Sequence, residues 1–259
     1  YTGGHCERVP VIAEMLARAA CDVKTGPFAE FNLTEAEWYE LHIACWLHDC
    51  GKVVTPVHVM DKSKKLETIN DRIDTVKARF EVLQRDARLV AYEREKAGED
   101  AATVRSELEQ NIAALKDDLA FLEKTNFGGE FLPREGQERI KRIAECTLEM
   151  GGERVPLLTA EEVQNLSISR GTLTEKERLI INAHMVHTVN ILNALPFPPQ
   201  LRRVPEYATG HHEKMDGTGY PRGIYAGDMS VPARIMAVIE PTAAGFPSNT
   251  IVTTPRLPG

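Results

Sequence analysis

Apolar residues recur along most of the chain with the three- and four-residue spacing of a helix, whereas alternating strand patterns are scarce. Three Thr-x-x-Glu capping boxes, which begin at Thr34, Thr159 and Thr174, each precede a stretch of this kind and predict a helix start. The first of these helices is expected to reach about Cys50, and the last is expected to reach about Leu195. The pattern therefore predicts an all-α fold.

Residues 62–125 differ from their surroundings because their apolar positions keep a heptad spacing. The first run consists of Leu66, Ile69, Ile73, Val76, Phe80, Leu83, Ala87 and Val90, and the second of Val104, Leu108, Leu115, Leu119 and Leu122. A polar stretch around Gly98 separates the runs, which predicts an antiparallel hairpin of two helices. Two interpretations are open: an insertion that stabilises itself, which we favour slightly, or an arm for homodimerisation or signal input.

The formal net charge of -7 argues against binding to DNA or RNA backbones, which requires clustered positive charge. A small phosphorylated ligand is compatible with this charge, since bound metal ions can invert the local field. Five cysteines without a CxxC pair indicate reduced thiols and a cytoplasmic protein, and no apolar run approaches membrane-spanning length. Because the chain begins at Tyr1 instead of Met, we expect a fragment, upstream of which a sensor domain or a membrane anchor could lie.

Five of the eight histidines stand beside a predicted helix end or a glycine-rich turn: His5, His48, His184, His211 and His212. Each one alone has an ordinary explanation, such as a surface hydrogen bond, a solvated loop or a satisfied position in the core. Asp49 follows His48 directly, and Gly51 supplies a helix end at which neighbouring side chains can reach one cavity. Five imidazoles and a carboxylate exceed the needs of one tetrahedral zinc site. They suit two transition-metal ions, Fe, Mn or Zn, that share Asp49.

These motifs occur in a specific order along the chain: His5, His48-Asp49-x-Gly51-Lys52, His184, His211-His212-Glu213 and Gly219-Tyr220-Pro221. This order resembles that of the HD-GYP family of bacterial phosphodiesterases, a helical branch of the HD phosphohydrolase superfamily. The resemblance covers roughly residues 1–60 and 170–238. It implies an HD-type helical bundle with the antiparallel hairpin inserted between these two parts.

The resemblance also implies a two-metal mechanism. The metal ligands would be His5, His48 and Asp49 for one ion, with Glu240 near the position of a further ligand, and Asp49, His184, His211 and His212 for the other. A hydroxide activated by both ions would attack phosphorus, with Asp49 and Lys52 as catalytic residues, since Lys52 neutralises charge on the phosphate oxygens. The substrate-binding residues would be Lys52, Asp216, Gly217, Gly219, Tyr220, Pro221 and Arg222. Tyr220 would stack or form a hydrogen bond, and Arg222 would grip a phosphate or a guanine edge.

Three positions depart from the family pattern. Thr188 stands where the family usually has Gly, and Tyr1 stands where some members have a Glu for a third metal, so two ions are expected. Glu240 takes the place of a metal-binding Asp, and the sequence no longer resembles the family beyond it. A weakened first metal site would leave a module that binds its ligand without turnover.

We expect five segments: residues 1–61 as the first part of the HD-GYP domain, 62–125 as the hairpin, 126–169 as connecting helices, 170–239 as the second part of the domain, and 240–259 as an irregular tail. The leading hypothesis is hydrolysis of cyclic di-GMP to pGpG or GMP in bacterial second-messenger signalling. The alternatives are a catalytically impaired module that binds a cyclic dinucleotide and an HD phosphohydrolase that acts on another nucleotide.

Overall fold

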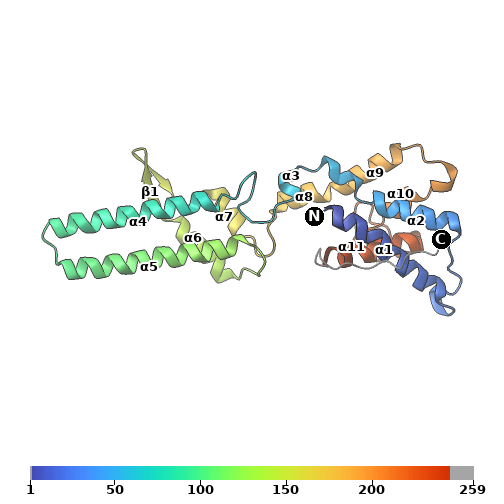
Figure 1. Ribbon diagram of the computed structural model, residues 1–259, viewed down its shortest axis with the longest axis horizontal. Coiled ribbons are helices and arrows are strands. Elements are labelled where there is room, and N and C mark those ends of the chain that lie inside the picture. Colours follow the sequence, from blue (N-terminus) through green and yellow to red (C-terminus); the bar gives the residue numbers. More distant parts are fainter. Residues whose placement is uncertain (1, 246–259) are drawn as a thin grey trace, which may run out of the picture. The chain divides into compact units, whose positions relative to one another are not determined.

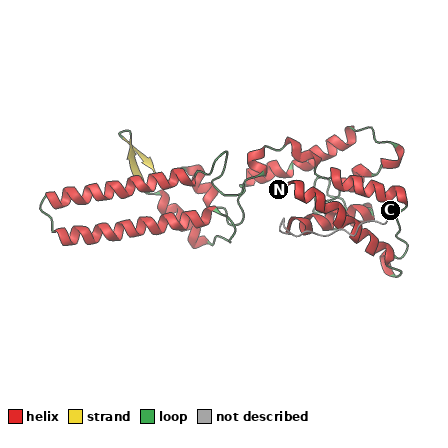
Figure 2. Cartoon of the chain, viewed as in Figure 1, coloured by secondary structure: helices red, strands yellow, loops and turns green. Residues whose placement is uncertain are grey.

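The computed structural model describes residues 2–245, with side chains from residue 4 to residue 239, and it divides the chain into two compact units. The first unit combines residues 1–55 with residues 180–259, and the second comprises residues 56–179. Helices dominate both units (Figures 1 and 2), which confirms the predicted all-α fold. None of the described helices combines the length and the apolar character that a membrane span needs.

The first unit is built around α2 (Glu35–Leu47). The other elements of this unit are α1 (Thr2–Asp22), η1 (Gly26–Phe28), η2 (Cys50–Val54), α9 (His184–Ala194), η3 (Pro199–Leu201), α10 (Val204–Ala208), η4 (Ala226–Asp228) and α11 (Val231–Gly245). Leu41 and Cys45 of α2 join one apolar cluster with residues of α1 and α11. Ala44 of α2 joins a second cluster with residues of α9 and α10. The residues that follow α2 are therefore surrounded by helices from distant parts of the sequence.

The three predicted capping boxes are confirmed. The Thr34 hydroxyl accepts the backbone N–H of Glu37, whose carboxylate accepts the backbone N–H of Thr34 in return. The boxes that begin at Thr159 and Thr174 form the same reciprocal pairs. The last predicted helix is interrupted, however: α8 (Glu175–Asn182) ends before Ala183, and α9 begins at His184.

The second unit contains the predicted antiparallel hairpin. Helices α4 (Ile73–Lys96) and α5 (Ala101–Asn126) run side by side in opposite directions (Figure 1), joined by a short turn in which Gly98 has a positive φ of 97°. The unit also holds α3 (Val57–Met60), α6 (Arg134–Ala144) and α7 (Ala160–Leu166). Residues of α4, α5, α6 and α7 share one apolar cluster, so the hairpin is anchored at the end where its chain enters and leaves.

The predicted heptad seam is wrong at both ends of its first run. Leu66 precedes α4, Ile69 is 96% exposed, and Val90 is 54% exposed. The buried face of α4 consists of Ile73, Val76, Phe80, Gln84 and Ala91. An α-helix has 3.6 residues per turn, so its buried stripe drifts away from a strict seven-residue repeat unless the helices supercoil.

Two short strands interrupt the connecting helices that were predicted for residues 126–169. Strand β1 (Thr147–Met150) pairs antiparallel with β2 (Glu153–Pro156). Gly151 and Gly152 join them with φ values of 63° and 82°, a conformation that glycine adopts without strain. The predicted irregular tail is corrected as well, because α11 continues from residue 240 to Gly245. Residues 246–259 lie outside the described part of the chain.

Candidate metal centre

The end of α2 places a histidine and an aspartate in the interior of the first unit. His48 is the C-cap residue of the helix, and Asp49 is the residue from which η2 begins. Their exposed fractions are 0% and 5%. The turn depends on Gly51, because a Cβ atom there would lie 2.1 Å from the carbonyl oxygen of His184. Helix α9 therefore packs directly on the backbone that follows Asp49.

His5 of α1 forms one cluster with His48 and Asp49. The Nε2 atoms of His5 and His48 are 3.2 Å apart. The Oδ2 atom of Asp49 lies 3.3 Å from Nε2 of His48 and 3.7 Å from Nε2 of His5. Three ligand atoms within 4.8 Å of one another can surround a single metal ion.

A second cluster combines His184, the first residue of α9, with His211 and His212, which follow α10. The Oδ1 atom of Asp49 lies 3.4 Å from Nε2 of His184 and 3.7 Å from Nε2 of His211. Asp49 thus presents a different carboxylate oxygen to each cluster. A carboxylate that bridges two cations has this arrangement.

The backbone fixes the tautomer of three of these rings. The Nδ1 atom of His48 contacts the carbonyl oxygen of Cys45 at 2.6 Å, and that of His211 contacts the carbonyl of Ala208 at 2.6 Å. The Nδ1 atom of His184 contacts the carbonyl of Ile181 in the same way. Because a carbonyl oxygen can only accept a hydrogen bond, each Nδ1 carries the proton. A neutral ring then has its lone pair on Nε2, the atom that faces Asp49.

The buried lone pairs of the imidazole rings and of Asp49 face one another, which favours a bound cation between them. Burial, together with the neighbouring His48 and His212, lowers the pKa of His211 to about 3, so this ring is neutral near pH 7. Among the described residues, Asp49 Oδ1, His184 Nε2 and His211 Nε2 are buried atoms without a hydrogen-bond partner. Buried acceptors that face one another are unfavourable unless a cation lies between them. Imidazole nitrogen and carboxylate oxygen are ligands that suit transition-metal ions, so the residues fit a metal centre.

Lys52 brings a positive charge to the edge of the centre. Its Nζ atom donates a hydrogen bond to Oδ2 of Asp49, and its side chain keeps 20% of its surface exposed. Burial by itself raises the pKa of Asp49, but its polar neighbours, among them the Lys52 ammonium group, outweigh it and hold that pKa well below its usual range. The carboxyl group of Asp49 is therefore ionised at neutral pH, as a bridging ligand must be.

The loop after His212 is organised by Glu213. This buried carboxylate accepts the backbone N–H groups of Arg222 at 2.8 Å and Ile224 at 3.1 Å. Asp216 accepts the backbone N–H and the hydroxyl of Thr218, which shapes the turn. Gly217 lies against the Tyr225 ring, and Gly219 lies against the backbone of residues 213 and 214. A Cβ atom would clash at both positions. Most of the predicted substrate-binding residues thus build the loop.

Tyr220 is the loop side chain that reaches the metal-ligand clusters. Its ring stacks on His212, with centroids 4.7 Å apart and planes inclined by 15°. Its hydroxyl lies 3.3 Å from Oδ1 of Asn182 at the end of α8, and Pro221 follows it through a cis peptide bond. Arg222, by contrast, donates to the hydroxyl of Thr209 at 2.9 Å. The structure therefore places Tyr220 beside the clusters, while Arg222 braces the loop against the end of α10.

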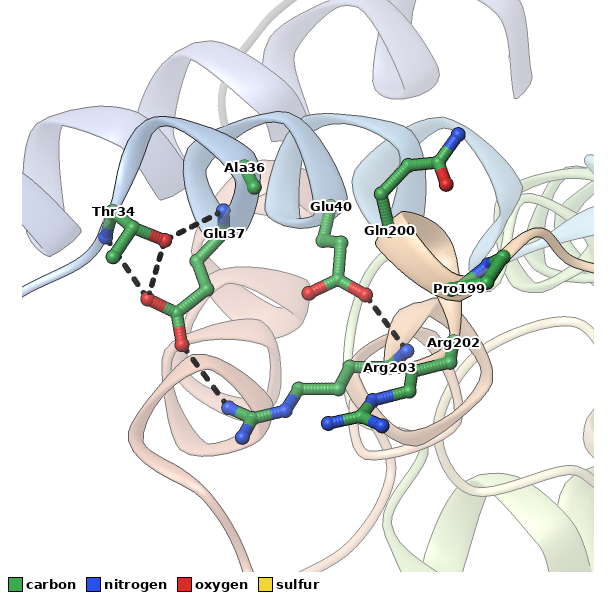
Figure 3. Close-up of a pocket in the computed structure, with 8 residues that line it drawn as sticks. All are labelled: Thr34, Ala36, Glu37, Glu40, Pro199, Gln200, Arg202 and Arg203. Carbon is green, nitrogen blue, oxygen red and sulfur yellow. Dashed lines mark hydrogen bonds and ion pairs between the residues drawn. The ribbon is translucent and has the colours of Figure 1, made fainter.

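Two glutamates of α2 hold α10 in place (Figure 3). The carboxylate of Glu40, 5% exposed, accepts the backbone N–H of Arg203, the N-cap residue of α10, at 2.8 Å. Glu37 accepts from the guanidinium group of Arg203 at 3.2 Å while it also caps α2. Since α2 leads to His48 and α10 leads to His211, these contacts fix the elements that carry the two clusters to each other.

The structure brings together every histidine predicted as a ligand, and both of their clusters meet at Asp49. The side chains of Glu240 and Tyr1 lie outside the described residues. Sequence reasoning assigned no site role to Asn182, Thr188 and Thr209, which contact the loop and the turn after Asp49. These are short polar residues in helical segments, and no local pattern marks them.

Comparison with known proteins finds a similarity to one family and to several relatives. Residues 130–241 match the HD domain family. Relatives from Vibrio cholerae serotype O1 (strain ATCC 39315 / El Tor Inaba N16961) include 3'3'-cGAMP-specific phosphodiesterase 3, which is 41% identical over 71 residues, 27% of this chain and 15% of the relative. Another is 3'3'-cGAMP-specific phosphodiesterase 1, which is 36% identical over 84 residues, 32% of this chain and 18% of the relative.

A shorter match, 51% identical over 35 residues, links 14% of this chain to 8% of a probable cyclic di-GMP phosphodiesterase of the same strain. The chain thus spans less than a fifth of the length of each of these relatives. No solved structure matches. The family match and the relatives together confirm the resemblance that the sequence motifs predicted.

Proposed function

We propose that this chain, whose HD-GYP-type domain belongs to the HD phosphohydrolase superfamily, hydrolyses a cyclic dinucleotide with two divalent transition-metal ions, Fe, Mn or Zn. One observation carries the proposal: the two carboxylate oxygens of Asp49 face two separate clusters of imidazole nitrogens. A single structural cation would not need five histidines arranged around both sides of one carboxylate.

The metal ligands fall into two sets. His5, His48 and Asp49 would hold one ion, and Asp49, His184, His211 and His212 would hold the other. Divalent ions in these positions would act as Lewis acids toward the scissile phosphodiester. The carbonyl groups of Cys45, Ile181 and Ala208 keep three of the rings in the tautomer that ligation requires.

Lys52 and the loop would bind and orient the substrate. The Lys52 ammonium group lies beside Asp49 and retains an exposed surface, so it can neutralise charge that grows on a phosphate oxygen. Tyr220 would offer its ring to a nucleobase, because aromatic side chains stack on bases with little dependence on sequence. Glu213 and Asp216 would hold the loop that carries Tyr220 in shape.

Cyclic di-GMP is the first candidate substrate. It follows from the family resemblance, and one relative is named as a probable cyclic di-GMP phosphodiesterase. A specific observation supports 3'3'-cGAMP as the second candidate: two relatives with longer matches are named as specific for it. Both are cyclic dinucleotides with two phosphodiester bonds, so the same metal centre can serve either, and residues outside the centre would set the preference.

The proposal is tested by elemental analysis and turnover on the same preparation. We expect two ions per chain, and release of a linear dinucleotide or mononucleotide from cyclic di-GMP, 3'3'-cGAMP or both. Asp49→Ala should abolish turnover and retain a helical far-UV spectrum. A protein with two ions that cleaves neither compound would contradict the proposed substrate class. Tight nucleotide binding without turnover, with one ion or none, would favour the binding-module alternative.

A further inference from the structure

Thr188 lies one helical turn after His184 on α9, and its side chain is directed at the turn that follows Asp49. The residue is fully buried, with an exposed fraction of 0%. Its hydroxyl oxygen accepts the backbone N–H of Gly51 at 3.0 Å. This hydrogen bond joins two segments that are 137 positions apart in the sequence and that each carry a predicted metal ligand.

The backbones of these two segments touch as closely as glycine permits. A Cβ atom at Gly51 would lie 2.1 Å from the carbonyl oxygen of His184, 2.4 Å from the backbone nitrogen of Thr188 and 2.6 Å from its hydroxyl oxygen. This packing limits how closely the turn after Asp49 can approach α9. The hydrogen bond from the Gly51 N–H to the Thr188 hydroxyl is directional, so it also fixes the position and orientation of the turn along the helix.

These contacts close a short circuit of four residues, Asp49, Gly51, Thr188 and His184, which are linked in turn by the backbone and by side-chain contacts. Gly51 is two residues after Asp49, and Thr188 is four residues after His184. Across the circuit, Oδ1 of Asp49 and Nε2 of His184 stand 3.4 Å apart, and neither atom has a hydrogen-bond partner among the described residues. The Gly51–Thr188 hydrogen bond lies within this circuit and can hold the separation between these two atoms constant.

We propose that Thr188 is a positioning residue for the second metal site: its hydroxyl fixes the turn of Asp49 against α9 and thereby sets the Asp49–His184 separation. The importance of Thr188 for catalysis rests on the proposed function. Its effect on ion affinity does not, because ion binding is measured without substrate.

Three substitutions separate the hydrogen bond from packing. Thr188→Val keeps the branched shape and removes the acceptor, Thr188→Ser keeps the acceptor and removes a methyl group, and Thr188→Ala removes both. Thr55→Val is the matched control, because the Thr55 hydroxyl at the end of η2 is also buried but has no hydrogen-bond partner among the described residues. It imposes the same chemical change without breaking a hydrogen bond.

The test is a titration of the metal-free proteins with Mn2+, followed by calorimetry and by the electron paramagnetic resonance signal of coupled ions. Thr188→Val and Thr188→Ala should bind one of the two ions about 10- to 100-fold more weakly, the usual effect of losing a group that orients a ligand. Thr188→Ser and Thr55→Val should bind both ions like the wild type. In turnover assays, kcat should fall in the first pair while KM stays near the wild-type value.

Two results would overturn the inference. One is wild-type affinity for both ions in Thr188→Val and Thr188→Ala, and the other is a loss in Thr188→Ser as large as in Thr188→Ala. If Thr188→Val does not fold, the comparison of Ala with Ser decides alone. A wild-type protein that binds two ions but cleaves no cyclic dinucleotide would refute the proposed function, while the ion affinities of the variants would still decide the role of Thr188.

Discussion

Replacing Asp49 by asparagine separates catalysis from folding in this domain. Asp49→Asn keeps the shape of the side chain, but one oxygen becomes an amide nitrogen that donates hydrogen bonds and cannot bind a metal ion. Because the two carboxylate oxygens lie 3.3 to 3.7 Å from the imidazole nitrogens of the two clusters, one substitution removes negative charge from both metal sites.

The expected loss of ion affinity follows from the charge. Two unit charges about 4 Å apart interact by about 4 kcal/mol at an effective dielectric constant of about 20. At 1.36 kcal/mol per factor of ten, this weakens ion binding at each site by at least about 10³-fold. Turnover should fall by a similar factor or more, because both ions are needed together.

The metal-free variant should keep most of its stability. The new amide group can donate to Nε2 of His184 or His211, two buried acceptors without a partner among the described residues, and such a bond contributes about 1 kcal/mol. Loss of the ion pair with Lys52 costs about 1 to 3 kcal/mol, because the side chain of Asp49 is 2% exposed while that of Lys52 is 20% exposed. The two contributions oppose each other, so the melting temperature should fall by no more than about 8 °C from the wild-type value.

Differential scanning calorimetry with chelator and with Mn2+ checks both expectations. Ions at about 100 times their dissociation constants should stabilise the wild type by about 2.7 kcal/mol for each of the two sites and leave Asp49→Asn unchanged. A variant that is stabilised by ions as strongly as the wild type would refute the bridging role. A metal-free variant that melts far below the metal-free wild type would show that Asp49 serves the fold instead.

Three further predictions concern the loop and the histidines. Tyr220→Ala should raise KM for the dinucleotide by about 10-fold, equivalent to roughly 1.4 kcal/mol of stacking, while Tyr220→Phe stays near wild type; equal KM values in the two variants would contradict a stacking role. Glu213→Gln turns one acceptor of the loop N–H groups into a donor, so KM should rise in steady-state assays while elemental analysis still finds two ions; loss of the ions would place Glu213 in the metal centre instead. In metal-free protein, urea unfolding should show stability that rises with pH between about 3 and 6.5, since the unfolded chain binds the His211 proton more readily than the folded one. The slope from this proton reaches about 1.4 kcal/mol per pH unit and should disappear in His211→Asn; an unchanged slope would exclude His211 as its source.

Local patterns predicted the elements that local interactions determine. Each capping box pairs a threonine with a glutamate three residues later. Its hydrogen bonds lie within one helical turn, so the sequence alone predicts it. The candidate ligands were found because imidazole binds metal ions and five histidines stand beside predicted helix ends or glycine-rich turns. Gly51, two residues after Asp49, predicted the end of a helix there. Their convergence on Asp49 is tertiary, and it was predicted from the number of imidazoles and from the family resemblance, not from a local pattern.

The errors arose where specific contacts override the periodicity of apolar residues. The heptad pattern continued through Val90, but the buried stripe of α4 passes through Gln84 and Ala91. The predicted long helix breaks at Ala183, where the carbonyl of Ile181 accepts the imidazole of His184. Thr188 was noted only as a departure from the family pattern, since its partner Gly51 is distant in the sequence.

The anchored imidazole of His211 has a thermochemical consequence. Because His211 holds its single proton on Nδ1 against the carbonyl group of Ala208 and is neutral near pH 7, an arriving ion finds an open lone pair on Nε2 and displaces no hydrogen ion from this ring. Near pH 7, the heat that the His211 ring contributes to ion uptake should therefore be the same in buffers of different ionisation enthalpy. His211 would thus join the centre without acidifying the solution around it.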